Sequence, residues 1–326
     1  MINTDNCQAM KKIAVQISPE AKSAYFKDYL QVARQELQQV AGWSDVGYRQ
    51  AGALEFFELD CEQADMPRLL RLSFVQGLYS IEGSCLAPID ELADFRLHED
   101  FVFGSKYRGK TNERLTQMLI NVGLSAIGRD PGEGVKLLDP MCGRATTLLW
   151  AMRYGITARG IEQDAKAIAD IRQSLKKWTK LHRQKHKMMD GFIGKPNKNG
   201  LGKFLDFNAE GATMRVVVGD ARQADQIFKK DKFDLLVSDL PYGVQHFTTD
   251  KTRNPLAVIG ESVTAWKHCL KSGGAIVLAF NSYIPKRTAI IETFEQAGFE
   301  ALAFSAAHRM SESIVRDVVV FKIQSA

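Results

Sequence analysis

One apolar run in this chain ends in a carboxylate, a proline and an aromatic ring. The run at 235–237 is followed, after one serine, by Asp239, Leu240, Pro241 and Tyr242. An aromatic amine is a poor nucleophile because its lone pair is delocalised, and two acceptors that hold its N–H bonds can restore that lone pair. The Asp239 carboxylate and the Leu240 carbonyl are such acceptors. Pro241 biases Leu240 towards an extended backbone, and Tyr242 offers a flat face for a flipped base. The stretch predicts an acceptor site for an exocyclic amine; the alternative is an ordinary turn.

A second candidate loop, DPMCGRATT, follows the strand-like run VKLLD. A glycine permits a tight turn here, and a helix is expected to begin near residue 145 or 146. The free N–H groups of a helix N-terminus attract a negative group, such as the carboxylate of an amino-acid-like ligand. A plain strand–turn–helix explains the loop equally well. The ligand-site candidates are Asp139, Pro140, Cys142 and Gly143.

Two further acidic residues follow strand-like runs. Glu162 ends TARGIE, about 20 residues after the first loop, where an acidic residue can accept hydrogen bonds from a ribose. Asp220, followed by Ala221, ends MRVVVGD and could accept a hydrogen bond from an adenine amine. The alternatives are a solvated Glu162 and a helix-capping Asp220.

Strands and helices alternate from residue 135 onward, which predicts a parallel sheet covered on both faces. Ligands bind at the carboxyl ends of the strands in such sheets, so the four candidate loops are expected to meet at one edge. The last two strand-like runs, EALAFSAAHR and IVRDVVVFKI, have no helix between them. They predict an antiparallel hairpin at the sheet edge.

The N-terminal part predicts a small α+β domain. Strands are expected at 12–17, 45–50, 53–59 and 78–83, and helices from residue 19 and over 66–76. This β-α-β-β-α-β order is that of a ferredoxin-like fold. Periodicity fades over 84–105, so we expect an N-terminal domain with its linker at 1–104 and a second domain at 105–326.

The amino-acid composition limits the classes of protein to which this chain could belong. The 326 residues are 45% hydrophobic and 25% charged, with a net charge of +5 and five scattered cysteines. This usage is ordinary for a globular protein, and the absence of paired cysteines fits a reducing compartment better than a disulfide framework. No signal peptide or membrane span is evident. We expect a cytoplasmic protein without a membrane partner, and the sequence predicts no oligomeric state.

A basic insert is predicted at about 179–212. Residues 176–203 hold nine Lys or Arg and one acidic residue, and the Gly and Asn of the second half suggest a mobile loop. Clustered cations grip phosphates, although a solvated surface explains them too. His182 and His186 lie four residues apart with no third ligand nearby, so no metal site is predicted. The nucleic-acid candidates are Lys176, Lys177, Lys180, Arg183, Lys185 and Lys187.

The region from about residue 106 resembles the S-adenosylmethionine-dependent methyltransferases. DPMCGRATT is similar to the D-P-x-C-G-x-G-T loop of amino-methyltransferases, and SDLPYG to their [NDS]-P-P-[YFW] motif. With KYRGKTNERLTQML upstream and HRMSESIVRDVVVF as a closing hairpin, the chain resembles RNA guanine-N2 methyltransferases related to the THUMP-domain or UPF0020 family. Ala145 replaces the second loop glycine, and Leu240 replaces the first proline.

The resemblance implies an α/β fold, namely a Rossmann-like seven-stranded sheet with a C-terminal antiparallel hairpin. It also implies S-adenosyl-L-methionine as cofactor, with Thr111 and Asn112 helping to line its site. The implied reaction is methylation of an exocyclic amine in tRNA or rRNA, with guanine N2 as the first candidate. DNA adenine or cytosine, or a protein glutamine, are alternative acceptors. A non-catalytic RNA-binding protein is the second alternative, which Ala145 supports.

Overall fold

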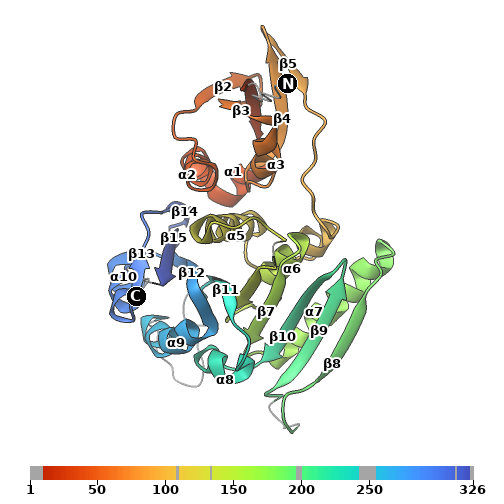
Figure 1. Cartoon of the computed structure of the whole chain (residues 1–326), viewed down its shortest axis with the longest axis vertical. Helices are drawn as coiled ribbons and strands as arrows, with labels where there is room; N and C mark the ends of the chain where they lie inside the picture. The colour runs from red at the N-terminus through yellow and green to blue at the C-terminus, as the bar shows by residue number, and fades with distance from the viewer. Residues whose placement is uncertain are drawn as a thin grey trace, which may run out of the picture.

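The structure is a computed structural model that describes residues 10–107, 110–132, 134–195, 200–241, 255–312 and 314–323. Figure 1 shows two β-sheets, with the N-terminal sheet at one end and a larger sheet at the other. Within the described ranges, every helix is too short or too polar to span a bilayer.

The N-terminal unit has a five-stranded antiparallel sheet of order β2-β3-β1-β4-β5. The predicted β-α-β-β-α-β order is present, and β5 extends the sheet into the segment expected to be linker. The second helix is shorter than predicted, because the chain is a strand again from Val75. The elements are β1 (Lys11–Ile17), α1 (Pro19–Tyr25), η1 (Phe26–Asp28), α2 (Tyr29–Ala41), β2 (Gly47–Ala51), β3 (Leu54–Cys61), η2 (Gln63–Asp65), α3 (Met66–Leu70), β4 (Val75–Glu82) and β5 (Cys85–Pro88).

The larger sheet has the order β13-β15-β12-β11-β6-β7-β10-β9-β8, with β14 paired to β15. The five strands from β12 to β10 are parallel, and the strands at both ends are antiparallel. The strands are β6 (Lys136–Asp139), β7 (Thr157–Glu162), β8 (Lys187–Phe192), β9 (Lys203–Ala209), β10 (Ala212–Val218), β11 (Phe233–Asp239), β12 (Leu270–Asn281), β13 (Phe299–Ala301), β14 (His308–Ser311) and β15 (Ile314–Ile323).

The prediction of seven strands is wrong, because the described residues already form ten strands in this sheet. The expected closing hairpin is present as β14 and β15. Most of the difference comes from the basic insert, which contributes the antiparallel hairpin β8–β9. The mobile loop is predicted for the second half of the insert, where residues 196–199 lie outside the described residues. In β9 the buried residues Leu205, Phe207 and Ala209 alternate with less buried ones, which is the period of a strand. Lysines, glycines and asparagines around this short run hide that period in the sequence.

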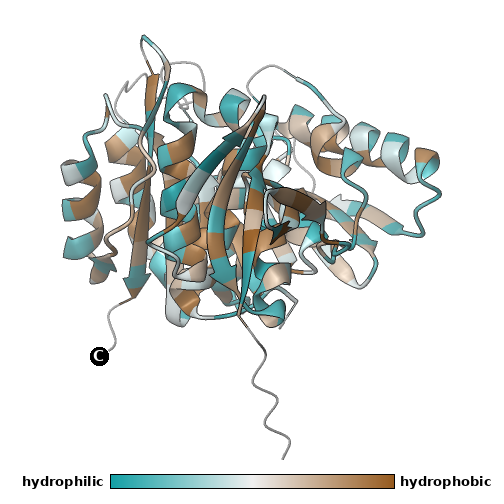
Figure 2. Cartoon of the chain, turned by 90° about the horizontal axis from the view of Figure 1, so that it is seen from above, coloured by the Kyte–Doolittle hydropathy of each residue, from teal (hydrophilic) through white to brown (hydrophobic). Residues whose placement is uncertain are grey.

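Helices cover both faces of the large sheet, and successive strand residues supply two separate cores. Leu137 and Leu235 pack into the core that includes α5, α6 and α7, whereas Leu138 and Leu236 pack into the core with α8, α9 and α10. Figure 2 shows the apolar colour on the strands and on the inner sides of the helices. The helices are α4 (Asp100–Phe103), α5 (Glu113–Ile127), α6 (Thr146–Arg153), α7 (Ala165–Leu181), η3 (Ala221–Gln223), α8 (Ala224–Phe228), α9 (Pro255–Cys269) and α10 (Arg287–Gln296).

Helix α5 lies between the two units (Figure 1) and is buried along the whole run 115–124. A buried polar network crosses this interface. Glu36 of α2 accepts hydrogen bonds from Ser73 N (3.0 Å) and from Asn121 Nδ2 of α5 (2.8 Å). Burial raises the pKa of Glu36, and Tyr154 Oη donates to Asn121 Oδ1 (2.7 Å). The two units therefore share one continuous core.

Candidate active site

The carboxyl ends of five parallel strands bring the predicted acidic residues to one edge of the large sheet. The strand registers pair Asp139 with Gly160, Glu162 with Val218, and Asp239 with Ala279. Because the strands are parallel and in contact, the loops that follow them lie side by side.

Glu162 closes the first loop. Its Oε2 accepts the Gly143 N–H (2.9 Å), and its Oε1 accepts the Asp164 N–H (2.8 Å). A carboxylate has about four lone-pair sites, so acceptor capacity remains for a ligand hydroxyl. Gly143 has φ 51°, and a Cβ added there would meet no atom within 4 Å. The turn therefore leaves open space beside the loop.

Cys142 packs against β7 and so holds the first loop in place. Its N–H donates to the Ile161 carbonyl (2.9 Å), and its thiol packs against Gly160, where an added Cβ would lie 2.7 Å from Cys142 Sγ. Burial raises the pKa of the Cys142 thiol well above its usual value. Cys142 thus fixes the loop by packing, as a neutral side chain.

Asp139 is buried at the base of the loop. Its Oδ1 accepts hydrogen bonds from Met141 N (3.0 Å) and Ser238 Oγ (2.8 Å). Burial raises the pKa of Asp139 from 3.8 to about 6, against the opposing effect of these donors. The negative charge of Asp239 raises it further.

Because of this pKa shift, the contribution of Asp139 to the free energy of unfolding depends on pH. Between pH 3.8 and about 6 the folded chain binds more protons at Asp139 than the unfolded chain, so its contribution to stability falls as pH rises. The shift corresponds to about 3 kcal/mol. We expect the free energy of unfolding of Asp139→Asn, relative to that of the parent, to rise by up to about 3 kcal/mol between pH 3.8 and about 6. Above that range the difference should stay constant. Urea unfolding at several pH values measures it, and a pH-independent difference contradicts it.

Asp239 ends β11 with its side chain 8% exposed, and Oδ2 lies 3.6 Å from an Arg316 guanidinium nitrogen. Leu240 N–H donates to the Ala279 carbonyl (2.9 Å), and the Leu240 side chain packs into the core beside α8 and α9. Pro241 follows, half-buried. Leu240 in place of proline is therefore anchored by burial. Tyr242 lies outside the described residues.

Arg316, which is not among the residues predicted from the sequence, lies beside Asp239 at the candidate site. It lies on β15 opposite Asn281, the last residue of β12, which brings it to the carboxyl edge. Its side chain is 5% exposed. The available signal was an arginine inside the apolar run IVRDVVVF, since charged side chains are seldom buried without a partner.

Asp220 is held by its own neighbour. Its Oδ1 caps η3 by accepting Arg222 N (2.9 Å), and its Oδ2 accepts an Arg222 guanidinium nitrogen (2.7 Å). Burial alone would raise the pKa of Asp220, but Arg222 outweighs it and lowers the pKa. Arg222 also binds Glu261 (2.8 Å), and the Ala221 carbonyl accepts the Trp266 indole N–H (3.0 Å). Here the capping alternative for Asp220 is observed.

The upstream segment reaches the first loop through Tyr107, whose hydroxyl donates to the Arg144 carbonyl (3.3 Å). Burial raises the pKa of Tyr107 to about 12. Asn112 caps α5 by accepting Leu115 N (3.0 Å), and Thr111 is half-buried just before it. The side-chain oxygen of Asn112 is thus used in folding.

The predicted nucleic-acid residues do not join the other candidates. Helix α7 begins beside Glu162 but runs for 17 residues, about 25 Å at 1.5 Å per residue. Lys187 pairs with Asn208, which faces Thr213 at the start of β10. The six basic residues therefore lie towards the opposite edge of the sheet. The tip of the β8–β9 hairpin returns to the carboxyl edge, where Gly202 N–H donates to the Val218 carbonyl (2.8 Å).

Ala145 adopts a left-handed conformation with φ 68° and is fully buried. This conformation costs a non-glycine residue about 1–2 kcal/mol. We expect Ala145→Gly to raise the free energy of unfolding by about 1 kcal/mol. Ala151→Gly, at a buried position with ordinary helical backbone in α6, is the control and should lower it by about 1 kcal/mol. Equal losses in the two variants would exclude strain at Ala145.

A family model described as UPF0020, RMKL-like, methyltransferase domain matches residues 112–303. No curated protein sequence matches the chain. Among solved structures, TrmN from Thermus thermophilus has a TM-score of 0.45 at 15% identity and covers 86% of this chain and 59% of its own. The T. thermophilus 16S rRNA N2 G1207 methyltransferase RsmC, solved with AdoMet and guanosine, has a TM-score of 0.41 at 15% identity, covering 92% and 62%.

The magnesium protoporphyrin IX methyltransferase ChlM from Synechocystis PCC 6803, solved with bound SAM, has a TM-score of 0.39 at 14% identity and covers 67% of this chain and 87% of its own. The chain spans less than two thirds of the length of TrmN or RsmC. The sheet is mixed and the fold is Rossmann-like, as the sequence predicts. Because the family model covers more than half of its 326 residues, the chain belongs to the UPF0020 family and contains its RMKL-like methyltransferase domain.

Proposed function

We propose that the protein is an S-adenosylmethionine-dependent N-methyltransferase that acts on an exocyclic amine of a nucleobase in RNA. Guanine N2 in a tRNA or rRNA is the proposed acceptor. The observation that carries this proposal is the placement of Asp239, Leu240 and Pro241 on the same sheet edge as the loop closed by Gly143 and Glu162. An amine acceptor and a nucleoside-type site are adjacent there.

S-adenosylmethionine supplies the methyl group when bound. The remaining acceptor capacity of Glu162 suits the ribose hydroxyls, and the open space at Gly143, next to Pro140 and the start of α6, suits the amino-acid end. Asp139 and Cys142 shape the loop. Thr111 and Asn112 contribute through the segment that Tyr107 ties to Arg144. Asp220 and Ala221 would contact the adenine only once Arg222 leaves Asp220.

At the acceptor, Asp239 and the Leu240 carbonyl accept the two amine N–H bonds, and Tyr242 stacks on the base. Holding the amine in line with the methyl donor supplies most of the rate enhancement, because positioning removes an entropic barrier. The amine loses one N–H proton when it is methylated, and Asp239 accepts the hydrogen bond from that N–H. Arg316 keeps a positive charge beside this carboxylate.

The RNA assignment is supported by the family and by the chain's basic surface. Lys176, Lys177, Lys180, Arg183, Lys185 and Lys187 would contact phosphates distant from the modified nucleotide, since they lie towards the opposite edge. A large folded RNA can reach both edges at once. Removing these charges should weaken RNA binding and its salt dependence without changing S-adenosylmethionine binding.

We also propose that residues 1–104 and 105–326 are the two domains, that the first has a ferredoxin-like fold and that the protein is cytoplasmic. The strand order β2-β3-β1-β4 and its antiparallel pairing support that fold. The described cysteines form no disulfide, which suits a reducing compartment.

The test is methyl transfer from labelled S-adenosylmethionine to RNA, DNA and protein prepared from cells lacking this protein. We expect label in RNA, with N2-methylguanosine as the modified nucleoside by mass spectrometry. Label in DNA or protein glutamine would replace the RNA assignment. Saturable S-adenosylmethionine binding by calorimetry separates an enzyme from a non-catalytic RNA-binding protein.

A further inference from the structure

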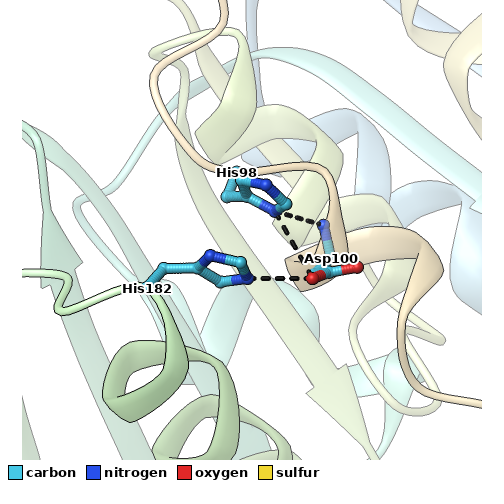
Figure 3. Close-up of side chains that lie close together, drawn as sticks. All are labelled: His98, Asp100 and His182. Carbon is cyan, nitrogen blue, oxygen red and sulfur yellow. Dashed lines mark hydrogen bonds and ion pairs between the residues drawn. The ribbon is translucent and has the colours of Figure 1, made fainter.

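Three potential metal ligands meet away from the carboxyl edge, at the end of α7 (Figure 3). His182 Nε2 lies 2.9 Å from Asp100 Oδ2, and His98 Nδ1 lies 3.6 Å from the same oxygen. One potential ligand atom from each residue lies within 4.8 Å of the others. His182 is the C-cap of α7, whereas the other two residues belong to the connection between the units. His182 and His186 lie four residues apart, from which no metal site is predicted; in the folded chain His182 lies beside His98 and Asp100 instead.

The surrounding contacts fix these segments against each other. Trp178 of α7 donates its indole N–H to Ser105 Oγ (2.9 Å), and a Cβ added to Gly104 would lie 2.3 Å from the Trp178 ring. The His98 and His182 rings stack with centroids 3.7 Å apart and an interplanar angle of 18°. The segments that carry the three side chains are therefore held together, which reduces the entropy lost on binding. His98 Nδ1 also accepts the Asp100 backbone N–H (3.1 Å), a hydrogen bond that an ion bound at Nδ1 would replace.

We propose that His98, Asp100 and His182 form a binding site for one divalent transition-metal ion, with zinc as the best-suited metal. Two imidazoles and a carboxylate are a donor set that zinc accepts, with water completing a four-coordinate shell. Ligand bonds of about 2.0–2.1 Å place tetrahedral ligand atoms about 3.3 Å apart, which the observed separations of 2.9 and 3.6 Å bracket. His98, the most exposed of the three, can adjust its ring while Asp100 and His182 stay in place.

The ion would join the inter-unit connection to the end of α7 and to the base of the β8–β9 hairpin. In its absence the Asp100–His182 hydrogen bond makes the same connection more weakly. Hard alkaline-earth ions are disfavoured because they select oxygen ligands. The site lies at the opposite end of α7 from Glu162, so its role is structural.

The experiment uses the full chain, stripped with a chelator, in a Cys7→Ser and Cys85→Ser background. Cys85 is the exposed cysteine among the described residues, and Cys7 lies outside them. Titration with zinc chloride by calorimetry should show one ion per chain with a micromolar or tighter Kd. His182→Gln and His98→Gln should each weaken binding at least tenfold. His186→Gln, which changes an exposed histidine outside the cluster, is the matched control and should bind as the parent does.

Two further readouts test the same site. Zinc should raise the unfolding temperature of the parent and of His186→Gln, but not of His182→Gln. Cobalt(II) should give the visible d–d absorption of a tetrahedral site only in chains that retain all three ligands. Unchanged zinc affinity in both His98→Gln and His182→Gln, or no zinc binding by the parent, would overturn the proposal. Methyl transfer is not needed for any of these measurements.

Discussion

Replacing Asp239 with Asn is expected to abolish methyl transfer and to leave S-adenosylmethionine binding nearly unchanged. Asparagine keeps the shape of the side chain, but its amide cannot take the charge that develops as the amine attacks. Removal of one preorganised electrostatic group costs about 10²–10³-fold in rate, and loss of the amine's position adds to this. Asp239→Ala should be equally inactive and also less stable, because it leaves a cavity beside the buried Arg316.

The measurement is the initial rate of labelled methyl transfer, together with calorimetric titration of S-adenosylmethionine. Ser311→Ala, at an exposed position on the hairpin, is the control and should keep its rate. A rate for Asp239→Asn within about tenfold of the parent, well below the cost of losing such a group, would remove Asp239 from the reaction. Loss of cofactor binding in the same variant would assign Asp239 to the cofactor side of the site.

Replacing Arg316 with Met should impair both stability and transfer. The Arg316 and Asp239 side chains are only 5% and 8% exposed, and breaking a buried ion pair costs about 3–5 kcal/mol. Without the neighbouring guanidinium, the Asp239 carboxylate loses the cation beside it, so the rate of methyl transfer by the folded variant should fall.

Arg316→Lys keeps a positive charge beside Asp239 and should keep more of the transfer rate than Arg316→Met does. The control is Arg309→Met on the neighbouring strand β14, where the side chain is exposed. If the folded Arg316→Met variant transfers methyl groups at the rate of the parent, Arg316 stabilises the fold but does not act on Asp239.

Local pattern was sufficient to predict the parallel strands and the sheet edge at which the candidate residues lie. Asp139, Glu162 and Asp239 were predictable because each ends an apolar run, and parallel strands bring such ends together. Arg316 was not, because its position depends on the pairing of β15 with β12. Likewise, the packing of α4 on α7 brings together His98, Asp100 and His182. Hydrophobic periodicity in the sequence does not predict such a tertiary contact. The sequence gives no position for the basic residues relative to the candidate site, because that position depends on the length of α7 and on the pairing of β8 with β9.

The position of α5 has a consequence for how this protein can be divided. The interior of α5 is buried on all sides, as expected of a helix enclosed by a core rather than lying on a surface. On one side it packs against β11 and β12, and on the other it receives α2 and the buried Glu36. The two proposed domains, 1–104 and 105–326, therefore each contain one sheet but share the core around α5. A fragment starting at residue 105 would expose to water the face of α5 that is buried in the full chain. Such an exposed apolar surface favours aggregation.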